Sequence, residues 1–231
     1  LCRKIAEKGG RASVFISEFN GESQNDILRR CVAESTIDGV ISLDNENDIR
    51  IPDSLPTVYL THSEKCDCVH SDYESAFYDA AARLAELGHT AIAFAGEPLT
   101  VAKKEHFISA LARLSLPCTP RFIFSEEGRF EISGKKAAEK ILLMPPPERP
   151  TAVLCAYDEI AYGLINTLRG GGVRIPEDIS VIGVNDIPTS RYPPYGTTKN
   201  VFAARLFLCC FVSSKSRSIG KKRIGFRFPV P

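Results

Sequence analysis

The sequence predicts an α/β fold built from two Rossmann-like parallel-sheet subdomains. Apolar runs of strand length alternate along the chain with longer segments in which apolar residues recur at the helical period. Glycines follow helical segments at Gly9-Gly10 and at Gly88, where such residues commonly end a helix. This alternation is typical of parallel strands joined by crossover helices. A chain of 231 residues can bury a substantial core.

Residues 1–70 form the first predicted subdomain, which we expect to be incomplete. The expected order is a helix ending at Gly9-Gly10, a strand at 12–17, a helix at 23–34, and strands at 39–43 and 56–60. The helical period places four apolar side chains on one face of the 23–34 helix: Ile27, Leu28, Cys31 and Val32.

Residues 71–196 form the second predicted subdomain, in which strands and helices alternate regularly. Helices are expected at 72–87, 101–114, 132–143 and 159–169, with strands at 91–95, 121–124, 152–155 and 180–184. The first of these helices directs five apolar side chains inward: Ala76, Phe77, Ala80, Leu84 and Leu87. A proline-rich loop at 144–150 separates the third helix from the next strand.

Residues 197–231 depart from this rhythm. They hold eight Lys or Arg and no acid, so the 28 acids and the remaining 21 bases give residues 1–196 a net charge of −7. An acidic body argues against nucleic-acid binding by the globular part, since phosphate neutralisation needs clustered bases. No element is assigned after Gly196, and we interpret this segment as an aberrant basic tail.

The residue types exclude several classes of site. Eight cysteines occur without a CxxC pair, so we expect reduced thiols in a cytoplasm, with Cys31 and Cys155 buried. No apolar run reaches 18 residues, and the first residues do not resemble a signal peptide. The glycines at 170–172 follow a helix and therefore stop it, whereas a phosphate cradle precedes one. Because catalytic and metal-binding motifs are absent, we expect no enzyme activity, metal or cofactor.

Four segments resemble the LacI/GalR family of bacterial transcription regulators, in the family's order and spacing. They are DGVI at 38–41, LGHTAIAF at 87–94, PTAVLCAYDEIAYGLI at 150–165 and RIPEDISVIGVND at 174–186. The last segment is the most specific, and it favours regulators over periplasmic binding proteins. The likeness covers residues 38–194.

This resemblance implies a periplasmic-binding-protein-like fold with a sugar or sugar derivative as effector in a cleft between the subdomains. It further implies a repressor that is a homodimer in the intact parent, is cytoplasmic, has no membrane association, and contacts operator DNA only through a helix-turn-helix head upstream of Leu1. A periplasmic or secreted sugar-binding protein of the same fold is the alternative. A sugar-modifying enzyme would need paired catalytic groups, for which the sequence offers no defensible candidates.

Side chains just after the strands are the candidate ligand contacts, because ligands of parallel α/β sheets bind beyond the carboxyl ends of strands. Asp158 is interpreted either as a helix N-cap or as an effector contact, and Tyr157 either stacks on a sugar ring or packs. Asn185 and Asp186 follow the 180–184 strand, where the resemblance implies hydroxyl recognition and the alternative is a turn.

Three further positions carry less specific signals. Lys103 stands near the start of a helix where the family usually has Arg, so it is either a ligand contact or a solvated helix charge. Phe130 lies where the family places an aromatic against the sugar face, with a core position as the alternative. Thr61 follows the 56–60 strand and either bonds a hydroxyl or caps a turn.

Three candidates remain around the first subdomain and its exit. Ser17 and Glu18 lie at the end of the 12–17 strand, where they are candidate ligand contacts. Asp72 starts the 72–87 helix, and we interpret it first as a cap and second as a residue at the cleft mouth.

Overall fold

The computed structural model describes residues 2–15, 23–43, 50–60, 67–185 and 187, together with strands at 210–213 and 222–224. The chain divides into two compact units. The first holds residues 1–71 and 209–224, and the second holds 72–208 and 225–231. The predicted α/β class with two sheets is confirmed.

The first unit contains a five-stranded sheet in the order β1-β2-β3-β8-β9. Its elements are α1 (Cys2–Glu7), α2 (Gln24–Ala33), β1 (Val40–Ser42), β2 (Thr57–Tyr59), β3 (Asp67–Ser71), β8 (Cys210–Ser213) and β9 (Lys222–Ile224). Strands β1, β2 and β3 are parallel, whereas β8 runs antiparallel to β3 and β9 antiparallel to β8. Strands β1 and β2 lie within the predicted strands at 39–43 and 56–60.

One sequence prediction for this unit is wrong. Residues 12–15 form no strand, and Val14 and Phe15 are exposed, because an apolar run becomes a strand only where a neighbouring strand supplies hydrogen bonds. On α2 only Leu28 and Cys31 are buried, while Val32 is exposed. Strand β3 (DCVHS) was missed, since the sequence pattern assigned no element to residues 67–71.

The segment after Gly196 contributes two strands where the sequence pattern assigned none. Strand β8 pairs with β3 along its whole length, with Val69 opposite Val212. Backbone pairing of this kind needs no particular side-chain period, which is why sequence periodicity did not find it. That residues 197–231 are an aberrant basic tail remains a prediction.

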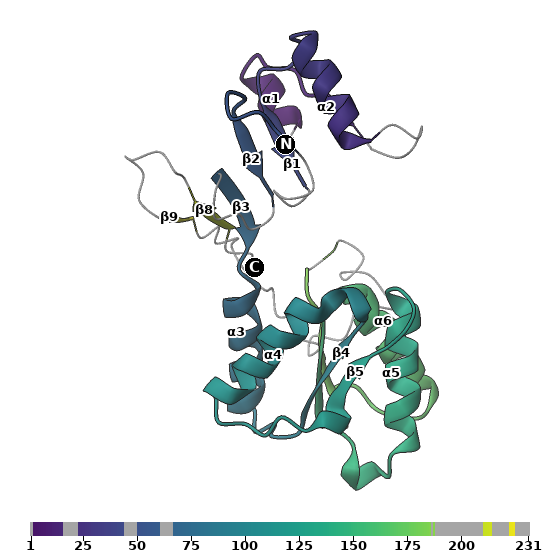
Figure 1. Ribbon diagram of the computed structural model, residues 1–231. Helices are drawn as coiled ribbons and strands as arrows, with labels where there is room; N and C mark the ends of the chain where they lie inside the picture. The colour runs from purple at the N-terminus through teal and green to yellow at the C-terminus, as the bar shows by residue number, and fades with distance from the viewer. Residues whose placement is uncertain are drawn as a thin grey trace. The chain divides into compact units, whose positions relative to one another are not determined.

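The second unit is a parallel sheet of four strands in the order β5-β4-β6-β7. Its elements are α3 (Tyr73–Glu86), β4 (Ile92–Gly96), α4 (Val101–Arg113), β5 (Ile123–Ser125), α5 (Glu131–Leu143), β6 (Ala152–Cys155), α6 (Asp158–Gly170) and β7 (Ser180–Ile182). Short 3₁₀ turns lie at Pro98–Thr100, Pro120–Phe122 and Pro146–Glu148. Helices α3 and α4 cover one face of the sheet, and α5 and α6 cover the other (Figure 1).

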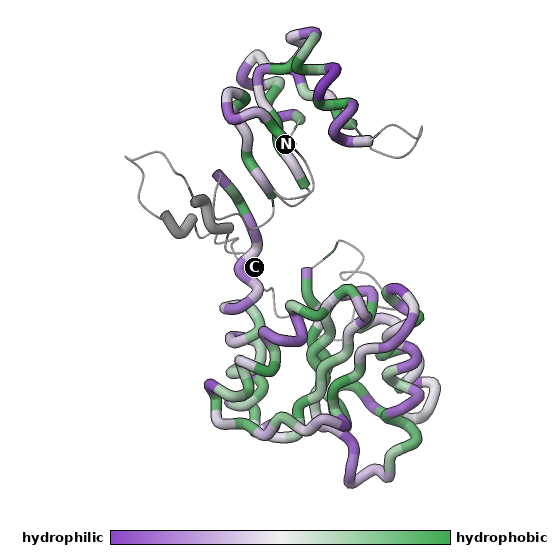
Figure 2. The backbone as a smooth tube through the Cα atoms, in the orientation of Figure 1, coloured by the Kyte–Doolittle hydropathy of each residue, from purple (hydrophilic) through white to green (hydrophobic). Residues whose placement is uncertain are grey.

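The core of this unit lies between the sheet and its two helical layers. Strands β4 and β6 are buried throughout and are largely hydrophobic in Figure 2. Phe94 of β4 packs between Phe77 of α3 and Phe107 of α4, with ring centres 6.3 and 5.6 Å apart. Leu87 is exposed, contrary to prediction, because α3 has already ended before Gly88, which has φ of 89°.

Helices α5 and α6 touch through their backbones at two glycines. A Cβ on Gly134 would lie 1.9 Å from the carbonyl oxygen of Ile160, and one on Gly163 would lie 2.0 Å from that of Glu131. No other residue fits at either position without separating the helices, because such distances are far inside van der Waals contact. The N-termini of both helices are therefore held close together.

We expect Gly163→Ala to destabilise the protein by about 2 kcal/mol or more, because the added methyl forces α5 and α6 apart. Gly170→Ala is the matched control, since it lies at the end of the same helix and a Cβ there meets nothing within 4 Å. Alanine there should be neutral or stabilise by up to about 1 kcal/mol. Urea unfolding followed by circular dichroism measures both, and equal midpoints for the two variants would contradict the proposed backbone contact.

Candidate functional site

The candidate site lies at the carboxyl edge of the second sheet. Because β4, β5, β6 and β7 are parallel, the segments that follow them meet at one edge. Five predicted residues belong to these segments or the helices they start: Lys103, Phe130, Tyr157, Asp158 and Asn185. Four other predicted residues lie outside the described part of the chain: Ser17, Glu18, Thr61 and Asp186.

Asp158 does not cap a helix, so the cap interpretation is wrong. Helix α6 begins at Asp158 itself, and the cap position belongs to Tyr157, whose side chain makes no capping bond. The buried Asp158 carboxylate instead accepts a hydrogen bond from the backbone N–H of Ile187 at 2.8 Å. Its backbone N–H donates to the carbonyl of Val184 at 3.0 Å. Asp158 thus ties the start of α6 to the segment after β7.

Gly183 makes this link possible. A Cβ at Gly183 would lie 2.3 Å from Oδ1 of Asp158, so any side chain there would displace the carboxylate. The residue two places on, Asn185, is exposed and has φ of 111°, a region that few residues other than glycine adopt. Asn185 is therefore presented on a segment whose start is fixed by Asp158.

Lys103 is buried, which overturns its interpretation as a solvated helix charge. Its side chain is 7% exposed, and Nζ donates to the carbonyl of Ala156 at 3.0 Å. The same Nζ lies 3.8 Å from the ring centre of Tyr157 and 4.3 Å from that of Tyr73. A lysine ammonium between two aromatic faces is stabilised by their electron density. Lys103 therefore holds the ring of Tyr157 in place through a cation–π contact.

The pKa of Lys103 is lowered to about 8, because burial disfavours the charged form. The nearby carboxylates of Glu159, Asp158 and Glu97 act in the opposite direction and moderate this fall. The pKa of Tyr157 is raised, first by burial and then by the charge of Glu97. Both shifts have the burial of the side chain itself as their largest cause.

Phe130 and Tyr157 form an aromatic pair at this edge. Their ring centres are 5.9 Å apart in an edge-to-face arrangement. Phe130 is 38% exposed, so the alternative of a core position is wrong. It occupies the cap position of α5 with φ of 52° and ψ of −118°, an uncommon conformation for a residue with a Cβ. The site thus includes an exposed aromatic surface.

Sequence reasoning missed Glu97, which follows β4 directly. Its side chain is completely buried, accepts a hydrogen bond from the N–H of Phe130 at 2.9 Å, and lies 3.0 Å from Nε of Arg129. The serine Ser133 donates to the carbonyl of Gly96 at 2.6 Å and joins the same two segments. A charged residue immediately after an apolar strand was the available signal.

Asp72 takes the capping role that the sequence favoured. Its side chain accepts a hydrogen bond from the N–H of Ser75 at 3.0 Å. A ligand role for Asp72 remains a prediction. The neighbouring Tyr73 belongs to the site through its contact with Lys103, and no sequence signal distinguished it from a core aromatic.

Neither metal chemistry nor membrane crossing finds support in the described residues. Among them, no three His, Cys, Asp or Glu side chains gather closely enough to hold an ion. In the same part of the chain, every helix is too short or too polar to span a bilayer. The buried Cys31 and Cys155 are free thiols, as the sequence predicts.

The lowered pKa of Lys103 predicts a pH-dependent stability. Between pH 8 and the ordinary value near 10.5, the unfolded chain binds more protons than the folded chain. The free energy of unfolding, relative to a Lys103→Met variant, should therefore rise with pH through this window. Urea unfolding at several pH values measures this difference, and ¹³Cε NMR titration should show one lysine with a midpoint near 8. Parallel stability profiles for the two proteins would refute the assignment.

Comparison with known proteins identifies the family. Residues 81–206, more than half of the chain, match the family model described as a periplasmic binding protein-like domain. The HTH-type transcriptional repressor PurR of Aliivibrio fischeri is 36% identical over 203 residues, covering 80% of this chain and 59% of that protein. The chain thus spans less than two thirds of this relative's length.

Solved structures show the same fold. A regulatory protein of the LacI family from Chloroflexus aggregans is 25% identical, with a TM-score of 0.72 over 83% of this chain and 72% of that one. A LacI family transcriptional regulator from Lactobacillus casei, solved with bound glucose, is 19% identical, with a TM-score of 0.62 over 82% of this chain and 75% of that one. The chain belongs to the LacI/GalR family of transcription regulators, as a periplasmic-binding-protein-like effector-binding core.

Proposed function

We propose that the effector of this core is a sugar or sugar derivative that binds at the carboxyl edge of the second sheet. The observation that carries this proposal is the exposed ring of Phe130 against Tyr157, at the sheet edge where the exposed Asn185 follows β7. An aromatic face packs against the C–H surface of a sugar ring. An amide both donates to and accepts from hydroxyl groups. Ligand sites commonly combine such apolar surface with a few placed polar groups.

The support beneath these groups favours a recognition role. Lys103 makes a cation–π contact with Tyr157, and Glu97 accepts a hydrogen bond from the backbone of Phe130. Asp158 accepts one from Ile187, in the segment that carries Asn185. Each contact group is thus fixed by a buried partner, which lowers the entropy lost on binding. The glucose bound to the relative from Lactobacillus casei agrees with this choice of ligand class, although that relative shares only the fold.

We further propose that the full-length protein is a cytoplasmic, homodimeric repressor in which effector binding changes the affinity for operator DNA. The repressors among its relatives support this over a secreted sugar-binding protein of the same fold. The net charge of −7 over residues 1–196 supports the proposal that operator contact lies outside this core. We propose a sensor without catalytic activity, since the described site groups serve to hold one another and to present a surface.

A thermal-shift screen tests the ligand class. The purified chain is screened with mono- and disaccharides. Nucleosides serve as a second class of ligand that can stack on aromatic side chains. A ligand at a hundred times its dissociation constant should add about 2.7 kcal/mol to the free energy of unfolding. Stabilisation by nucleosides and by no saccharide would contradict a sugar effector.

Two substitutions test the site once a saccharide has been found. Phe130→Ala and Asn185→Gly should each weaken its binding by about 1 to 3 kcal/mol, because each removes one contact with the ligand. Glycine is chosen at Asn185 because φ there is 111° and alanine would add backbone strain. Isothermal titration calorimetry measures the affinities.

Leu143→Ala is the matched control, since Leu143 is an exposed apolar residue at the opposite end of α5 from Phe130. It should bind the saccharide like the parent. If Phe130→Ala and Asn185→Gly fold and also bind like the parent, the ligand does not contact this edge of the sheet.

A further inference from the structure

Glu97 is a fully buried carboxylate beside the exposed aromatic surface. Its backbone is fixed by Thr100, whose hydroxyl accepts from the N–H of Glu97 at 3.0 Å and donates to its carbonyl at 2.7 Å. The Glu97 side chain is 0% exposed although it carries a charge. Buried charges are costly unless they are paired, so the partners of this carboxylate define its role.

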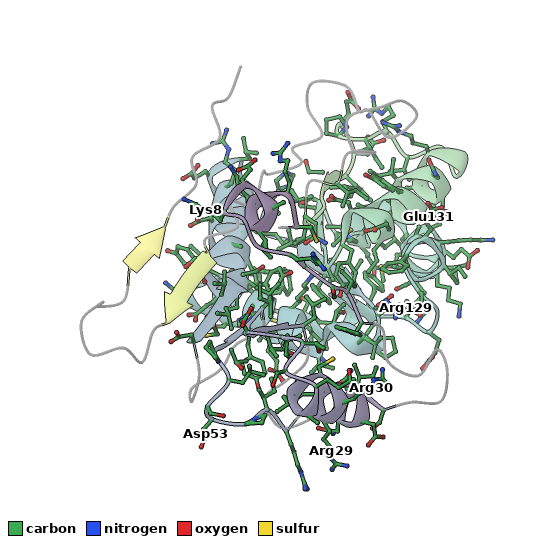
Figure 3. All side chains as sticks on the ribbon, turned by 90° about the horizontal axis from the view of Figure 1, so that it is seen from above. Lys8, Arg29, Arg30, Asp53, Arg129 and Glu131 are labelled. Atoms are coloured by element: carbon green, nitrogen blue, oxygen red, sulfur yellow. The ribbon has the colours of Figure 1, made fainter. Side chains whose placement is uncertain are left out.

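Both partners of Glu97 belong to the segment that presents the aromatic surface. Oε2 accepts the N–H of Phe130 at 2.9 Å, while Oε1 lies 3.0 Å from Nε of Arg129. The second contact is an ion pair without hydrogen-bond alignment, since Oε1 has no hydrogen-bond partner in the described structure. Arg129 and Glu131, labelled in Figure 3, flank Phe130 in sequence at the start of α5.

Arg129 has an exposed side chain whose charge is neutralised by Glu97. Its side chain is 56% exposed, and the guanidinium carbon lies 4.5 Å from the centre of the Phe130 ring. A guanidinium in this position offers planar donors to a carboxylate or phosphate. Glu97 weakens the attraction of Arg129 for such an anion, because its own negative charge lies 3.0 Å from Nε of the guanidinium.

The other cation near the aromatic pair is also occupied. Lys103 donates to Ala156 and lies between two tyrosine rings. Asp158 and Glu159, whose charges act on Lys103, are acids, and Oε2 of Glu159 is buried without a hydrogen-bond partner in the described structure. Among the described residues, Glu159 therefore offers an oxygen that can accept a hydrogen bond and that would repel an anion.

We propose that Glu97 is a specificity-determining residue, which neutralises Arg129 and so restricts the aromatic surface to uncharged sugars over sugar acids and sugar phosphates. This inference rests on the proposed sugar-binding function and adds the charge class of the ligand. Glu97 acts through Arg129 and Phe130 and is a positioning residue. Without its charge, the guanidinium beside Phe130 is free to pair with a ligand carboxylate or phosphate.

The test compares the parent chain with Glu97→Gln, Arg129→Gln and the double variant. Glutamine at position 97 keeps an oxygen for the N–H of Phe130 and removes only the charge. Calorimetry with glucose, glucuronate, glucose 6-phosphate and inorganic phosphate gives the ratio of anion to glucose affinity. Glu97→Gln should raise this ratio by about ten-fold or more, as expected for a new charge-assisted hydrogen bond. The double variant should lose the gain.

The exposed Arg129→Gln variant keeps the test decisive if Glu97→Gln fails to fold. In the parent, Arg129 is neutralised, so Arg129→Gln should not weaken the binding of glucuronate or phosphate. A loss of anion binding in Arg129→Gln would overturn the proposal, as would an unchanged ratio in a folded Glu97→Gln.

A readout independent of sugars separates this inference from the proposed function. The ¹Hε–¹⁵Nε NMR signal of Arg129, assigned by its absence in Arg129→Gln, is followed during titration with inorganic phosphate. It should shift in Glu97→Gln and remain fixed in the parent, whether or not any saccharide binds. Absence of saccharide binding by the parent defeats the sugar function alone, while a phosphate-induced shift in the parent defeats the role of Glu97.

Discussion

The backbone contact between α5 and α6 is the constraint on which the site depends. Gly134 and Gly163 each occupy a position where a Cβ would meet a carbonyl oxygen of the other helix at 2.0 Å or less. This contact brings the two N-termini together, and with them the residues that precede each helix, Phe130 and Tyr157. Because a cap residue is joined directly to the first turn of its helix, the packing of α5 against α6 also sets the positions of Phe130 and Tyr157.

Buried polar groups then turn this edge into a defined surface. Lys103, Glu97 and Asp158 come from different helices or strand ends, and each reaches across to a neighbouring segment. In poorly hydrated surroundings such contacts are expensive to break, so each segment is held in one arrangement. The contacts of Lys103, Glu97 and Asp158 thus hold together segments at the carboxyl edge of the sheet that are not paired as strands.

The sequence located the residues near the site better than it predicted their roles. Tyr157 and Asn185 were candidates because they follow strands, a position set by local pattern, whereas Phe130 was a candidate through the family resemblance. The role of Asp158 was misjudged, because an aspartate at a helix start resembles a cap until the segment after β7 is seen beside it. Glu97 stood directly after an apolar strand, but neither it nor Tyr73 carried a local sign of its role, since their partners are distant in sequence.

By itself, the sequence determined the alternation of strands and helices in the second unit, the α/β class and the family resemblance. The alternation and the class follow from hydrophobic period and from glycine and proline positions, which act over a few residues. The resemblance rests on four sequence motifs. Tertiary structure decided that residues 12–15 form no strand, that residues 210–213 pair with β3, and that Lys103 is buried. It alone brought Glu97 against Arg129. Pairing and burial depend on which segments meet in space, and periodicity carries no information about that.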